Sequence, residues 1–193
     1  FAETRSDTDT RLELWSLETG DVQGRLDIAG TPALVALDGS GATRIGNVPF
    51  NYDLAFPPDR APETIRGRAF VSAPGVTGNS IYVLGPSADV PAKEVVANIP
   101  GYSGPLTFDD EGHLYYVTTT FEPTNTLARF TAAQLESAVE GDAVDFTAGE
   151  VLLDDLEGAY GLRWNRGQLF LTNLGYGSGA GAIEIVDLES ATP

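Results

Sequence analysis

Residues 106–118 have the sequence LTFDDEGHLYYVT, in which two short runs rich in apolar residues flank an acidic turn that ends in glycine. Tyrosine, valine and threonine are typical of strands, and aspartate and glycine are typical of tight turns because they tolerate turn backbone angles. The stretch therefore predicts a β-hairpin whose turn is residues 109–112.

A phrase of the same form occurs three times: a leucine, one variable residue, an aromatic residue and then polar turn residues. Its leucines are Leu54, Leu106 and Leu162, which are 52 and 56 residues apart. Each phrase is followed by an apolar strand, a turn and a third strand, and the first two units are closed by a fourth strand. The expected second strands span residues 69–72, 114–118 and 169–172, the third strands 81–84, 127–130 and 183–186, and the fourth strands 94–97 and 150–153.

Four short antiparallel strands that repeat at about 50 residues are typical of β-propeller blades. We therefore expect an all-β chain, a β-propeller with four-stranded antiparallel blades, and keep a β-sandwich as the alternative. Further strands are expected at residues 12–17, 33–38 and 43–49. The expected organisation of residues 1–193 is a single propeller domain or part of one, with a partial blade at 11–49, blades at 50–100 and 101–156, and a partial blade at 157–190.

One short helix is expected inside the β chain, near residues 131–139. Thr131 and Gln134 have the spacing of a capping box, in which each side chain bonds the other residue's backbone N–H. Leu135, Ala138 and Val139 then fall on one face of the helix.

Residues 106–118 and 162–172 resemble blades of bacterial propellers of the NHL-like, gluconolactonase-like and YVTN types, and the resemblance covers about residues 50–190. It implies the fold and no particular activity, because such folds host unrelated functions. A propeller ring needs about four to eight blades, so we expect an incomplete ring or a fragment of a propeller of about six to eight blades.

Composition limits the classes of partner. The chain has 28 acidic and 11 basic residues and a net charge of −17, which repels phosphate, so no nucleic-acid partner is expected. No run approaches the ~20 apolar residues of a membrane span. There is no cysteine, which excludes disulfides and thiolate metal ligands. The acidic composition, the start at Phe1 and the resemblance to exported propellers lead us to expect a periplasmic or secreted, extracytoplasmic location.

The acidic turn offers a candidate cation site. Asp109 and Asp110 could hold Ca²⁺, which prefers oxygen ligands, and the alternative is a polar hairpin tip kept soluble by its charge. His113 is the only histidine and is expected to be a solvated turn residue. No catalytic residue is therefore predicted.

The resemblance to gluconolactonase-like enzymes implies a second candidate metal site. Those enzymes bind a divalent metal through Asn, Asp and Glu side chains at or just before the innermost strands. Asn51 and Asp53 match this pattern in the first repeat, whereas the later repeats offer Ser103, Gly104, Ala159 and Tyr160. This departure argues against a metal-dependent hydrolase of the lactonase-like type, which we keep as an alternative function.

Tyr52, Tyr102 and Tyr160 fall just before the innermost strands, and Glu157 lies close to the third of them. These residues are predicted to form a face for a ligand or partner, since tyrosine supplies rigid contact area, or else to pack between blades. We expect a non-catalytic binding and assembly module for a protein partner, the rest of the propeller or a small ligand. A structural subunit that docks through open blade edges is a further alternative.

Overall fold

The computed structural model describes the backbone of the strands within residues 1–50, and residues 51–75, 78–85, 90–120, 125–173 and 181–188 in full. The chain has two compact units, Phe1–Phe50 with Leu84–Ala92, and Asn51–Val83 with Lys93–Pro193. About half of the residues are in strands of antiparallel sheets, so the all-β prediction is confirmed.

The first unit contains two small antiparallel sheets. One has the order β1-β2-β3, and the other is the hairpin β4-β5. The expected strands at 12–17, 33–38 and 43–49 overlap β2, β4 and β5, whereas β1 and β3 were not predicted. The strands are β1 (Ala2–Ser6), β2 (Asp9–Trp15), β3 (Val22–Ile28), β4 (Ala33–Leu37) and β5 (Ala42–Asn47).

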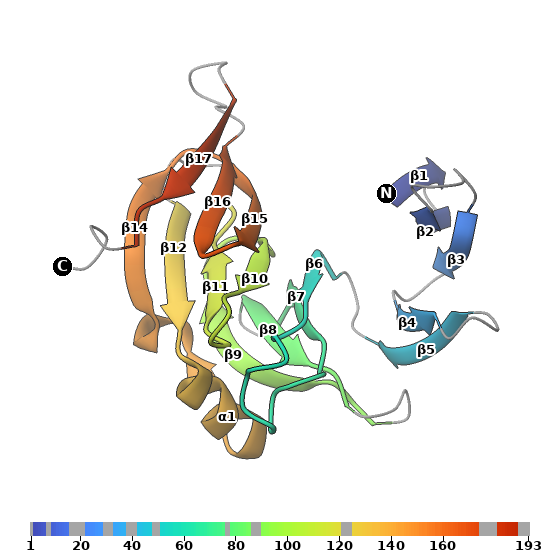
Figure 1. The fold of residues 1–193 in the computed structure, drawn as a ribbon, viewed down its shortest axis with the longest axis horizontal. Coiled ribbons are helices and arrows are strands. Elements are labelled where there is room, and N and C mark those ends of the chain that lie inside the picture. Colours follow the sequence, from blue (N-terminus) through green and yellow to red (C-terminus); the bar gives the residue numbers. More distant parts are fainter. Residues whose placement is uncertain are drawn as a thin grey trace. The chain divides into compact units, whose positions relative to one another are not determined.

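The second unit contains three sheets, whose strands run along the colour bar of Figure 1 from teal and green through yellow and orange to red. The strands within each sheet follow the chain in order and are antiparallel, except that β13 joins β9 in parallel as an unpredicted fifth strand. The first sheet is β6 (Asp53–Ala55), β7 (Phe70–Pro74), β8 (Asn79–Val83), β9 (Lys93–Ile99) and β13 (Val144–Asp145). The middle sheet is β10 (Leu106–Phe108), β11 (Leu114–Val117), β12 (Asn125–Phe130) and β14 (Glu150–Leu156), and the third sheet is β15 (Ala159–Asn165), β16 (Gln168–Asn173) and β17 (Ala182–Val186).

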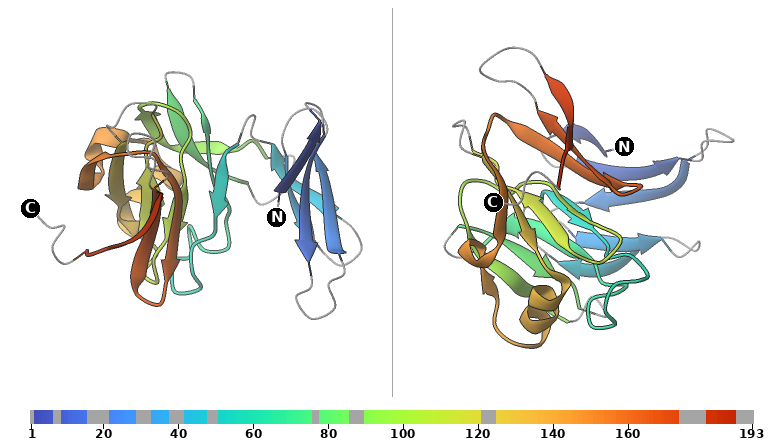
Figure 2. Two further views of the ribbon diagram at one scale, coloured as in Figure 1. Left: turned by 90° about the horizontal axis from the view of Figure 1, so that it is seen from above. Right: turned by 60° about the vertical axis from the view of Figure 1, so that its left-hand side comes forward.

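The middle sheet is buried on both faces, which explains the unbroken apolar run in β11. Leu114 and Tyr116 pack toward the first sheet, while Tyr115 and Val117 on the opposite face pack toward the third sheet. Side chains alternate along a strand, so a strand covered on both faces needs apolar residues at every position. Figure 2 shows the middle sheet between its two neighbours.

Within the described residues of the second unit, the third sheet is covered on one face only. Leu169 and Leu171 on β16 are fully buried against the middle sheet, and Phe170 between them is half-buried on the other face. Opposite Phe170 lies Ile185, and opposite Thr172 lies Ile183. Ile183 and Ile185 are 76% and 57% exposed, so this outer face of the third sheet is largely open to solvent.

The predicted helix is confirmed as α1 (Ala132–Glu140), followed by a short 3₁₀ turn at η1 (Phe146–Ala148). Thr131 Oγ1 accepts from Gln134 N at 3.2 Å, and Gln134 Oε1 accepts from Thr131 N at 2.8 Å, which is the predicted capping box. Leu135 and Ala138 are buried in the core between the first and middle sheets. Among the described residues, no helix has the length and apolar character to cross a membrane.

Candidate functional site

Asp53, predicted as a partial metal ligand, connects the first strands of all three sheets in the second unit. Its Oδ1 accepts a hydrogen bond from Leu54 N at 2.9 Å, and its Oδ2 accepts from Leu106 N, at the start of β10, at 3.2 Å. Oδ2 also lies 3.4 Å from Nη1 of Arg163 on β15. Both carboxylate oxygens therefore have protein partners, which favours a structural role for Asp53. Asn51, the predicted co-ligand, is half-buried two residues earlier.

The predicted tyrosine face lies near the same strands. The Tyr52 hydroxyl donates to the carbonyl oxygen of Tyr160 at 3.2 Å and so joins residues 108 positions apart. The backbone N–H of Tyr102 donates to the carbonyl oxygen of Thr119 at 2.6 Å. Tyr52 and Tyr102 are 44% and 57% exposed. Glu157 is exposed between β14 and β15.

Tyr116, which the repeat pattern did not single out, lies among these tyrosines. Its hydroxyl accepts from Gly104 N at 2.8 Å and donates to the carbonyl oxygen of Tyr102 at 3.5 Å. Burial raises the pKa of Tyr116, and the nearby Tyr52 adds to the increase. Its place in the apolar run at 114–118 could have identified Tyr116 in the sequence. A tyrosine in a buried strand needs a hydrogen-bond partner for its hydroxyl.

Asp109 begins the hairpin turn between β10 and β11 and is buried, with 6% exposure. Its Oδ1 accepts from Glu111 N at 2.9 Å and from His113 N at 2.8 Å. Its Oδ2 accepts from the Tyr115 hydroxyl at 3.1 Å. The turn ends at Gly112, whose φ of 86° favours glycine. Asp109 thus organises the hairpin, while Asp110, its predicted partner for Ca²⁺, is exposed beside it.

His113 differs from the expected solvated residue. Its Nδ1 accepts from the backbone N–H of Ala132, at the start of α1, at 3.0 Å, and its Nε2 lies 3.5 Å from Glu111 Oε2. The histidine therefore satisfies one of the unpaired amides at the helix N-terminus.

One donor atom from each of Asp109, Glu111 and His113 lies within 4.8 Å of the others, a spacing at which a metal ion could be held. The hydrogen bonds already made by Asp109 and by His113 Nδ1 leave His113 Nε2 and Glu111 as the principal atoms for such a role. The group is therefore better described as a hairpin and a helix cap than as a complete cation site.

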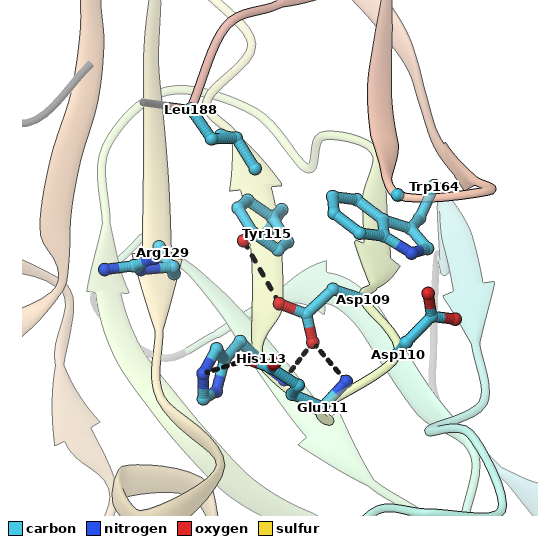
Figure 3. Close-up of a pocket in the computed structure, with 9 residues that line it drawn as sticks. Asp109, Asp110, Glu111, His113, Tyr115, Arg129, Trp164 and Leu188 are labelled. Atoms are coloured by element: carbon cyan, nitrogen blue, oxygen red, sulfur yellow. Dashed lines mark hydrogen bonds and ion pairs between the residues drawn. The ribbon is translucent and has the colours of Figure 1, made fainter. Parts of the chain in front are cut away.

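A cavity of about 350 Å³ opens beside this hairpin, between the middle and third sheets. In the view of Figure 3, Arg129 and Trp164 lie on opposite sides of Tyr115, and Asp109 lies between Tyr115 and the turn. The cavity thus combines acidic, basic and aromatic groups. Its lining residues are Asp109, Asp110, Glu111, His113, Tyr115, Arg129, Trp164, Gly167 and Leu188.

Aromatic and charged contacts hold the cavity wall in place. The rings of Tyr115 and Trp164 stack with centroids 5.9 Å apart and an angle of 13° between planes. Burial, followed by the charge of Asp109, raises the pKa of Tyr115 to about 12. Arg129 forms an ion pair with Glu150 on β14. Its Nε and the Trp164 Nε1 are buried and have no hydrogen-bond partner among the described residues.

No protein-family model matches the chain, and no curated protein matches its sequence.

Proposed function

We propose that this chain is a binding and assembly module of the β-propeller type that docks a partner protein through the third sheet. The observation that carries the proposal is the exposure of Ile183 and Ile185 on β17, an edge strand whose sheet is buried on its other face. Exposed apolar edge strands are templates for pairing with another strand.

The propeller architecture is supported by the order of strands in the second unit. The first sheet places β6 to β9 side by side, and the middle sheet does the same with β10, β11, β12 and β14, all antiparallel. In addition, β10 contacts both β6 and β15. In both sheets a fourth strand lies beside the third: β9 beside β8, and β14 beside β12. The third sheet has no strand beside β17 within the described part of the chain. The repeat therefore indicates what binds there: one more antiparallel strand.

Charge identifies the kind of strand. In the middle sheet, Arg129 on the third strand lies opposite Glu150 on the fourth and pairs with it. On β17 the charged residue is the exposed Glu184, and the whole chain has a net charge of −17. A second copy of the chain would bring two strongly acidic surfaces together, so the fitting occupant is a strand of a partner protein with alternating apolar and basic residues.

A fluorescent peptide of alternating valine and lysine tests this docking, with an otherwise identical valine–glutamate peptide as the charge control. We expect saturable binding of the lysine peptide by fluorescence anisotropy, and weakening by about tenfold or more in Ile185→Ser. Val151→Ser is the matched variant. Val151, like Ile185, is an exposed β-branched side chain on an edge strand (52% exposed), but it lies on β14 rather than β17. It should bind like the wild type.

Hydrogen exchange locates the bound peptide, which should slow exchange of the β17 amides. Equal binding of both peptides, or equal loss in both serine variants, would contradict recognition at β17. If the chain forms a concentration-dependent dimer that Ile185→Ser abolishes, the occupant of β17 is a second copy of the chain and not a partner protein.

A further inference from the structure

We propose that the outer edge of β14, the edge that faces away from β12, docks a helix–strand segment of a partner protein. The segment is built like α1–β13 of this chain and carries a basic residue opposite Asp155. Within the described residues, β14 is the last strand of the middle sheet (Figure 1). The inference is independent of docking at β17, because β17 is the edge of another sheet and the strand proposed there is antiparallel.

β9 and β14 are corresponding strands of two successive repeats, and they have the same irregular pairing with the strand before them. The register shifts at the same two places in both sheets, which gives each strand the same bulges. The matching pairs are Asn79 with Ile99 and Ile81 with Val96 in the first sheet, and Asn125 with Leu156 and Leu127 with Leu153 in the middle sheet.

The backbone of the two strands agrees at a second, less common feature. Asn98 in β9 has a φ of 59°, and Asp155 in β14 has a φ of 56°. A positive φ is uncommon outside glycine, and asparagine and aspartate adopt it more readily than other residues do. β14 therefore presents its outer edge in the same form as β9, with Asp155 in the place of Asn98 and Leu153 in the place of Val96.

The outer edge of β9 is covered by a segment of the next repeat, the insertion between β12 and β14. β13 in this insertion pairs with β9 in parallel, with Val144 opposite Val96. Asn98 Nδ2 donates to Asp145 Oδ2 on β13 at 2.8 Å. α1 contacts both β9 and β13, and Val96 is fully buried. The pair of Asn98 and Asp145 thus joins the left-handed position to the added strand.

The corresponding edge of β14 has no added strand within the described residues. Leu153, the counterpart of buried Val96, is only half-buried, and Val151 is 52% exposed. Exposed apolar edge strands are templates for pairing. β13 has only two residues, so the fitting occupant is a short parallel strand together with an apolar helix face such as that of α1.

The residue at the left-handed position determines the charge of the occupant. Asn98 donates to a carboxylate of β13, whereas the exposed carboxylate of Asp155 can only accept. Asp154 beside it is also exposed. The occupant should therefore carry lysine or arginine where β13 has Asp145. A second copy of this chain fits poorly, because its segment would bring Asp145 against Asp155.

The test uses two peptides of residues 131–148, one with the sequence of this chain and one with Asp145→Lys. Each is titrated into the isotope-labelled whole chain, and the amide signals of β14 are followed by NMR. We expect saturable shifts with the lysine peptide and a dissociation constant on the order of 1 mM. The unmodified peptide should bind about threefold more weakly or worse, since exposed charge pairs have effects of this size.

Asp155→Asn gives β14 the amide that Asn98 supplies in β9, and asparagine tolerates the positive φ. In this variant the preference should reverse, so that the unmodified peptide binds about threefold more tightly than the lysine peptide. Asp110→Ala removes an exposed carboxylate from another part of the middle sheet and should keep the wild-type preference. Ile185→Ser should also keep it, which separates this surface from docking at β17.

Three outcomes would overturn the proposal. The first is the absence of saturable shifts at β14 with the lysine peptide, or shifts at β9 in place of β14. The second is the same peptide preference in the wild type and in Asp155→Asn. The third is tighter binding of the unmodified peptide to wild-type β14, which would make a second copy of the chain the occupant.

Discussion

Replacing Asp109 by alanine should destabilise the second unit far more than is usual for an aspartate in a hairpin turn. The carboxylate accepts from two backbone amides and from the Tyr115 hydroxyl, and it is 94% buried, since its exposure is 6%. An unsatisfied buried hydroxyl costs about 1–3 kcal/mol, and a lost hydrogen bond to a charged acceptor about 1.5–3 kcal/mol. Because water can replace the carboxylate at the amide of exposed Glu111, we expect a total loss of about 3–5 kcal/mol.

The assay is urea unfolding followed by Trp164 fluorescence in a Trp15→Phe background, so that the signal reports on the second unit. The matched control is Asp110→Ala, which removes the adjacent exposed carboxylate and should change stability by about 0.5 kcal/mol or less. Asp109→Asn keeps one acceptor oxygen and should fall between the two variants. If Asp109→Ala and Asp110→Ala differ by less than about 1 kcal/mol, the turn is not organised by the Asp109 carboxylate.

Three further predictions concern the same hairpin. His113→Ala should cost about 1 kcal/mol in urea unfolding, because the first amide of α1 loses its cap; an unchanged midpoint would refute the cap. Gly112→Ala should lower the free energy of unfolding by about 1–3 kcal/mol, because its φ of 86° disfavours alanine and the added Cβ would lie 2.9 Å from Ala61 Cβ. Gly167→Ala should lower it less, because Gly167 has a similar φ of 79° but open space around it. Folding raises the Tyr115 pKa from 10.0 to about 12, so the folded state holds this proton more strongly and the stabilisation is complete below pH 10 and lost as the pH rises to about 12. Wild type should therefore lose more stability across this window than Tyr115→Phe, and parallel pH profiles would contradict the shift.

The strands and the helix of the second unit follow from local patterns. The run at 114–118 predicted β11 because a strand covered on both faces needs apolar residues at each position. Thr131 and Gln134 predicted the start of α1 because a capping box involves only residues three apart. The parallel pairing of β13 with β9 joins residues 48 apart, such as Val144 and Val96, and no local pattern specifies it.

The candidate site could be predicted only in part, because its contacts join distant segments. The Asp-x-x-Gly spacing identified the turn, yet it did not show that Asp109 is buried and accepts a hydrogen bond from Tyr115. Trp164 reaches the cavity from β15 and Arg129 from β12, so their meeting depends on how the sheets pack. Arg163 lies 110 residues from Asp53, with which it pairs. A sequence of repeats predicts the sheets and does not predict which side chains meet between them.

The position of Asp53 has a consequence for cooperativity. In repeat architectures each unit ordinarily gains stability from its immediate neighbours alone. Asp53 bonds β10 of the adjacent sheet and Arg163 of the sheet beyond it, and the bond from Tyr52 to Tyr160 spans the same two outer sheets. These contacts form only when three successive repeats are in place together. Fraying of the third sheet would remove the contacts of Asp53 and Tyr52 with Arg163 and Tyr160, so we expect the first and third sheets to be coupled in unfolding although they are not adjacent.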